Sequence, residues 1–140
     1  MSARCPFEKA ILSAQCTCEL SDRFSVAEQM GVNCRSDIAR TNCATLLALM
    51  RERARFALRV TDTSANLPFG KEMKVMVGGL IGLQGQLVTG AGPGQVDNIH
   101  ALIQQAQARY GSLEALPYQE LVKAITAFQP RRRAPVPPKP

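Results

Sequence analysis

The sequence predicts an all-α protein, a small irregular bundle of about five helices with an extended tail rich in Pro and Arg. Ala, Leu, Gln, Glu, Arg and Met dominate its periodic segments, and these residues favour helix. Apolar residues recur there at intervals of three and four, whereas the alternating Val-rich runs typical of strands are missing. For 140 residues, of which 46% are hydrophobic, we expect one helical domain over residues 1–129 and the tail over residues 130–140.

The first helix is expected to begin just after Cys5. Pro6 suits its first turn, where a missing N–H leaves no hydrogen bond unmade, and the carboxylate of Glu8 suits the positive end of the helix dipole. A break follows, and then a short segment over residues 25–30 that ends at Gly31. The pattern is helical almost throughout, so we expect no sheet here.

A long helix over about residues 36–59 is the most clearly patterned element. Ser36 can cap it, and Asp37 lies in its first turn. Arginines crowd its second half, either as a ridge for phosphate or carboxylate groups or as a solvated face that suits the helix end. The expected buried stripe comprises Ala39, Cys43, Leu46, Leu47, Met50, Ala54, Ala57 and Leu58.

The rest of the domain is expected to hold three more helices. Gly78 and Gly82 stand four residues apart in the first of them, where they would let another helix approach closely. Gly111 is expected to end the second. These elements are a loop at 61–68, a helix at 69–87, a turn at 89–94, and helices at 96–110 and 117–128.

The charge is basic and concentrates at the end of the chain. The net charge is +6, and four basic residues lie in the Pro-rich tail. A basic surplus speeds association with any acidic surface and does not choose among nucleic acid, lipid and protein. We find no segment that resembles an export signal or a transmembrane helix, so we expect a cytoplasmic protein. An odd number of cysteines cannot all pair within one chain.

The cysteines supply most of the chemistry that the sequence offers. All five lie in the first 43 residues, which favours a shared task over use as scattered core residues. No Cys-x-x-Cys occurs, so neither a zinc knuckle nor a thioredoxin-type pair is indicated, and the usual ferredoxin spacings are also missing. They are Cys5, Cys16, Cys18, Cys34 and Cys43.

Helix geometry separates one cysteine from the others. If residues 6–16 form one helix, Cys5 and Cys16 stand about 16 Å apart along its axis, too far for one metal centre. Cys5 is then the outsider, unless that helix is shorter or the chain curls back. The expected metal ligands are Cys16, Cys18, Cys34 and Cys43.

Four thiolates suit an iron–sulfur cluster or zinc. The irregular spacing favours the cluster, because structural zinc sites draw ligands from tight spacings. Arg35 and Arg40 would offset a cluster's negative charge. Zinc is the less favoured metal, and buried or redox-active thiols without metal remain an alternative.

The sequence therefore favours a small iron–sulfur protein that acts as an electron-transfer or accessory subunit of a larger redox complex. It offers no catalytic set of Ser, His and carboxylates, so we expect no enzyme activity from this chain alone. The lone His100 is interpreted as a core histidine, with a ligand or proton-donor role as the alternative. A protein partner is expected. Two alternatives remain: a metal-free helical adaptor, and a redox-sensing regulator that binds nucleic acid through the Arg-rich helix.

Overall fold

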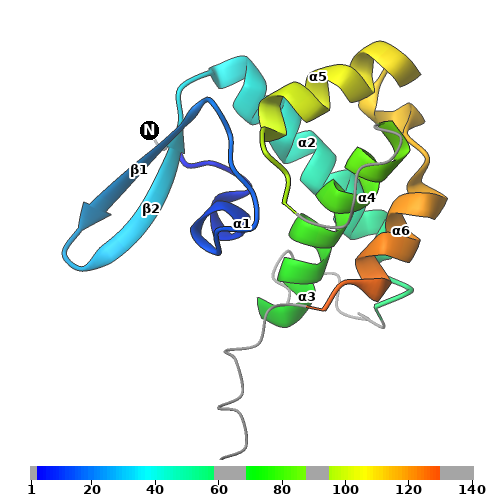
Figure 1. Ribbon diagram of the computed structural model, residues 1–140, viewed down its shortest axis with the longest axis horizontal. Coiled ribbons are helices and arrows are strands. Elements are labelled where there is room, and N and C mark those ends of the chain that lie inside the picture. The colour runs from blue at the N-terminus through cyan, green and yellow to red at the C-terminus, as the bar shows by residue number, and fades with distance from the viewer. Residues whose placement is uncertain (1–2, 59–68, 88–94, 130–140) are drawn as a thin grey trace, which may run out of the picture.

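The computed structural model describes residues 3–58, 69–87 and 95–129. Figure 1 shows a hairpin on one side of the molecule and a group of packed helices on the other. The expected loop at 61–68, turn at 89–94 and tail at 130–140 lie outside the described residues.

A β-hairpin corrects the all-α prediction. Strand β1, Ser21–Val26, pairs antiparallel with β2, Gln29–Cys34, so the fold is mixed although helix dominates. The segment expected at 25–30 is the tip of this hairpin and not a helical turn. Ala27 and Glu28 join the strands with φ of 50° and 70°. Positive φ at both central residues is the geometry of a type I′ hairpin turn, which is usually formed by Asn-Gly.

The hairpin forms because β2 has both a buried face and a second partner. Val32 and Cys34 are buried, whereas the residues at the hairpin tip are exposed. On its other edge β2 pairs with the N-terminal segment, where the Cys5 N–H donates to the Val32 carbonyl at 2.8 Å. The Cys34 N–H donates to the Ala3 carbonyl at 2.7 Å. β2 thus lies between β1 and the start of the chain.

The first helix, α1, is much shorter than expected. It covers only Glu8–Leu12, where the sequence indicated helix over residues 6–16. Phe7 and Ile11 anchor it in the core. Soon after it ends, Ala14 adopts a φ of 67°, a left-handed conformation that turns the chain away from the helix direction.

The long helix, α2, begins where the sequence predicts and ends before the predicted residue 59. It covers Asp37–Ala54, and Ser36 caps it by accepting a hydrogen bond from the Ala39 N–H at 3.1 Å. Ala57 is exposed, because regular helix has ended before it, so its place in the expected stripe was wrong. The confirmed buried residues of the stripe are Ala39, Cys43, Leu46, Leu47, Met50, Ala54 and Leu58.

The Gly-containing helix is confirmed, and it packs as expected against another helix. It consists of α3, Phe69–Met73, a π-helical segment η1, Lys74–Gly78, and α4, Gly79–Leu87. A Cβ on Gly78 would lie 2.9 Å from the Ile125 Cα, and one on Gly82 would lie 2.6 Å from the Ala124 Cβ. These glycines therefore allow the close approach of the last helix.

The remaining helices also lie where the sequence placed them. α5 covers Ile99–Tyr110 and is capped by the Asn98 side chain, and Gly111 ends it with a φ of 91°. A 3₁₀ turn, η2, covers Leu113–Ala115, and α6 covers Tyr118–Ala127. In Figure 1, α4 and α6 lie side by side, and α5 crosses above them. None of the described helices combines the length and apolar character that crossing a bilayer requires.

Candidate metal centre

The strand register places Cys5 and Cys34 on one face of the small sheet. Arg4 and Asn33 pair antiparallel, so Cys5 lies opposite Val32, and Cys34 lies two residues beyond Val32 on β2. Residues that face each other across strands share a side of the sheet, and so do residues two apart on one strand. Both cysteines are buried, with 9% and 8% of their surface exposed, so their shared side is the one that faces the core.

Cys18 is held beside Cys34 by the start of β1. Ser21 lies directly opposite Cys34, and both its N–H, at 3.1 Å, and its hydroxyl, at 2.8 Å, donate to the Cys18 carbonyl. The Arg35 N–H donates to the Leu20 carbonyl at 3.0 Å, which closes the same end of the hairpin. The half-buried Cys18 therefore lies next to the point where β2 passes into α2.

Cys43 completes the group from the buried stripe of α2. Burial raises the pKa of the Cys43 thiol above its ordinary value, and the nearby thiols of Cys5, Cys18 and Cys34 raise it further. Burial likewise raises the pKa of Cys5 to about 11, with smaller contributions from Cys18 and Cys34 and an opposing one from the Phe7 N–H. Cys5, Cys18, Cys34 and Cys43 thus lie near one another, and we call these four residues the thiol cluster.

Cys16 lies apart from the thiol cluster. It is fully buried and forms a parallel bridge with Val96, just before α5. Burial raises the pKa of Cys16 to about 12, and the Val96 N–H opposes this shift. The pKa of Cys16 is therefore set by the protein interior and by the backbone at Val96. The pKa of Cys43, by contrast, is also shifted by neighbouring thiols.

Three of the four expected ligands, Cys18, Cys34 and Cys43, lie within electrostatic range of one another, and Cys5 lies in the same range. The expected separation of Cys5 from Cys16 assumed one helix over residues 6–16, and α1 is only five residues long. A signal for Cys5 was present in the sequence. A residue that precedes proline, as Cys5 precedes Pro6, is biased toward extended backbone, which is the conformation that pairs with β2.

The donor atoms have the chemistry that a metal or cluster needs. All five cysteines are free thiols, and thiolate sulfur suits iron–sulfur clusters and zinc. Within residues 3–58, 69–87 and 95–129, no three His, Cys, Asp or Glu side chains are arranged to hold one metal ion as they stand. Because burial keeps Cys5 and Cys43 protonated near neutral pH, binding at these residues would release protons.

Two arginines lie against the rim of the thiol cluster. Arg40 Nη1 lies 3.5 Å from the Cys34 carbonyl oxygen, and its Nη2 donates to Asp37 at 2.6 Å. Arg35 donates to the backbone carbonyl of Glu19 and pairs weakly, at 3.8 Å, with Asp22. The two guanidinium groups place positive charge at the junction between β2 and α2.

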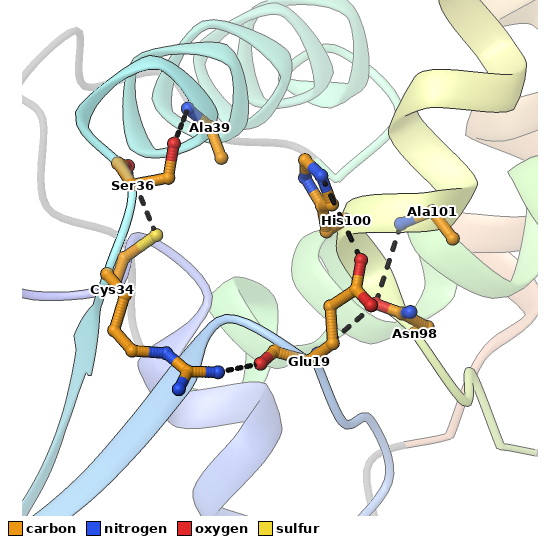
Figure 2. Close-up of polar contacts among 8 residues, drawn as sticks. Glu19, Cys34, Ser36, Ala39, Asn98, His100 and Ala101 are labelled. Carbon is orange, nitrogen blue, oxygen red and sulfur yellow. Dashed lines mark hydrogen bonds and ion pairs between the residues drawn. The ribbon is translucent and has the colours of Figure 1, made fainter.

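A pocket of about 380 Å³ adjoins the thiol cluster at Cys43. Figure 2 shows the space between Ser36 at the start of α2 and His100 at the start of α5, with Cys34 below. His100 is half-buried, and its Nε2 lies 3.9 Å from Glu19 Oε2. The histidine therefore lies in the pocket wall with an acidic partner, at the edge of the core and not within it.

Comparisons with protein-family models, with curated proteins and with solved structures find no significant match.

Proposed function

We propose that this chain is a small iron–sulfur protein and that the thiol cluster holds the iron–sulfur cluster. One observation carries the proposal: four thiols from four separate segments lie within electrostatic range of one another, three of them buried. Cys5 comes from the N-terminal segment, Cys18 from the loop before β1, Cys34 from the end of β2 and Cys43 from α2.

Iron–sulfur is favoured over zinc by the way the ligands are supplied. Structural zinc sites usually take two ligands from one tight turn, and here each of the four thiols comes from a different segment. The two guanidinium groups at the rim would offset the negative charge that four thiolates give an iron–sulfur cluster. Binding would draw the four sulfur atoms toward a common point and remove protons from Cys5 and Cys43.

We further propose that the chain transfers electrons or serves as an accessory subunit of a larger redox complex. A bound iron–sulfur cluster would exchange single electrons, while the residues around it exclude water and set its charge environment. The exposed apolar side chains Val26 and Met30 at the hairpin tip support contact with a protein partner. A reducing cytoplasm would suit such a site, because thiols stay free there.

Nucleic-acid binding through the Arg-rich end of α2 receives less support. Arg51 pairs with the buried carboxylate of Glu72, with 3.0 Å between Nε and Oε1. Arg53 lies over the Tyr118 ring, 4.8 Å from its centroid, and Arg55 pairs with a neighbouring glutamate in its own helix. These three arginines are engaged within the protein, which favours a structural role for them.

Metal analysis of the whole chain, purified without oxygen, tests the proposal. We expect iron and acid-labile sulfide in comparable amounts, with absorbance near 400 nm that disappears on exposure to air or chelator. Zinc without sulfide would replace the iron–sulfur proposal with the zinc alternative. Folded protein that contains neither metal would favour the metal-free adaptor and refute the proposal.

A further inference from the structure

We infer that the pocket beside Cys43 binds the flat ring of a flavin. The pocket lies between the first two turns of α2 and the face of α5 that looks toward them, and its volume of about 380 Å³ falls in the usual range for small-molecule sites. We call it the amide pocket, because three carboxamide side chains line it: Asn42, Gln104 and Gln107.

The side chains of the amide pocket select for a neutral ligand that both donates and accepts hydrogen bonds. Each carboxamide offers an N–H₂ donor and a carbonyl acceptor, and the Ser36 hydroxyl and the His100 ring add two further polar groups. Apart from His100, the lining residues carry no ionisable side chain other than the Cys43 thiol. A phosphate or carboxylate ligand would therefore find no guanidinium or ammonium partner among them.

A flavin ring has the complementary polar edge. Its pyrimidine edge presents an N–H donor between two carbonyl acceptors, which a pair of carboxamides can match with their own donors and acceptors. The flat faces of the ring need apolar cover, which Ile38 mainly provides, while the nearly buried Ala39 and Ile103 add a small apolar area. Ile38 is 77% exposed, so a ring in the pocket would remove part of this apolar side chain from water.

The position of the pocket would place a bound flavin beside the thiol cluster. Cys43 belongs both to the pocket lining and to the thiol cluster, so a bound ring would lie against a proposed ligand of the iron–sulfur cluster. A role of the flavin as an electron partner rests on the proposed function. Binding of the ring rests on the pocket alone.

The probe is lumiflavin, which carries the ring without a sugar or phosphate. Its fluorescence is titrated with the full chain, both as purified without oxygen and after removal of metal. The chain contains no Trp, so the flavin signal is free of indole quenching. We expect saturable binding in both preparations. A protein that contains no iron but binds lumiflavin would refute the proposed function and leave the pocket inference intact.

Two glutamine variants on α5 supply the matched comparison. Q104A together with Q107A should weaken lumiflavin binding about tenfold, because each lost hydrogen bond contributes about 0.5–1.5 kcal/mol. Gln105 is exposed, is the immediate neighbour of Gln104 and does not line the pocket, so Q105A should leave binding unchanged. Circular dichroism establishes that the variants fold.

Three results would overturn the inference. Lumiflavin that fails to bind saturably to folded wild-type protein would remove the site. Equal weakening by Q105A and by the paired variant would place the ligand elsewhere. Menadione, a flat quinone without the N–H donor, should bind more weakly, and tighter binding of menadione would contradict recognition of the pyrimidine edge.

Discussion

Cys5 and Cys16 are both buried free thiols near the start of the chain, and their surroundings give them different roles. Cys5 lies on the sheet face that it shares with Cys34, whereas Cys16 contacts the backbone at Val96. The difference comes from one hydrogen-bonded pairing, between Cys5 and Val32, across 27 positions of sequence. Spacing along the chain shows that cysteines concentrate, but it does not show which of them a distant strand will bring together.

The buried thiols predict that the metal-free fold weakens at high pH. An ordinary cysteine titrates near 9.0, whereas the pKa of Cys5 is raised to about 11 and that of Cys16 to about 12. Folding therefore favours the protonated thiols. Their contribution to the free energy of unfolding is fully present below pH 9 and is lost as the pH rises toward 11 to 12. Urea unfolding of reduced, metal-free protein should show the midpoint falling between pH 8.5 and 10.5.

The Cys16→Ala variant provides the control for this pH dependence. Removing the buried sulfur also alters packing and so changes stability at pH 7. The informative quantity is therefore the slope of stability against pH. That slope should be shallower than in the wild-type protein. An unchanged slope would contradict the assignment of this pH dependence to buried thiols. Burial also raises the pKa of Tyr118 to about 12. Ionisation of this tyrosine at high pH therefore lowers stability equally in the wild-type protein and in the variant.

At the scale of elements, the hairpin carries two members of the thiol cluster at its base. Cys34 ends β2, and Cys18 is tied to the first residue of β1. The hairpin turn uses two residues with positive φ and side chains, Ala27 and Glu28, a conformation that costs L-residues about 1–2 kcal/mol each. The turn therefore holds strain that better turn residues would relieve.

Replacing Ala27 by Asn and Glu28 by Gly should stabilise the protein by about 1–2 kcal/mol, because this pair favours the type I′ turn. Urea unfolding measures the gain, and iron content should stay unchanged because the turn lies at the far end of the hairpin from Cys34. Replacing Glu52, which lies inside α2, by Gly should instead destabilise the protein by about 1 kcal/mol. Loss of stability in the turn variant would show that the hairpin does not form as described.

Helices were largely predictable from the sequence, and the hairpin was not. The Ser36 cap and the regular apolar stripe define α2 by local rules, and Gly78 and Gly82 announce a close helix contact. Residues 21–34 lack the usual hairpin signals: the turn is Ala-Glu, and the apolar residues nearest to it, Val26 and Met30, stay exposed. The π segment at 74–78 also carries no local signal. These features arise from contacts between distant segments.

At the scale of the whole molecule, one core joins a cysteine-bearing end to a helical end. The hairpin, α1 and the start of α2 hold the thiol cluster, while η1 and α6 pack against α2, and α4 packs on α6 through a glycine contact. Gly79 lies against Met50 in the same core. The helical end therefore fixes α2, and α2 in turn fixes the position of Cys43.

We propose that Cys5, and not Cys16, joins the other three thiols around an iron–sulfur cluster. The most direct measurement is the iron and sulfide content of the C5S and C16S variants, purified side by side without oxygen, with circular dichroism to establish that both fold. We expect C5S to lose most of its iron and visible absorbance and C16S to keep both. Iron retained in folded C5S and lost from folded C16S would contradict it.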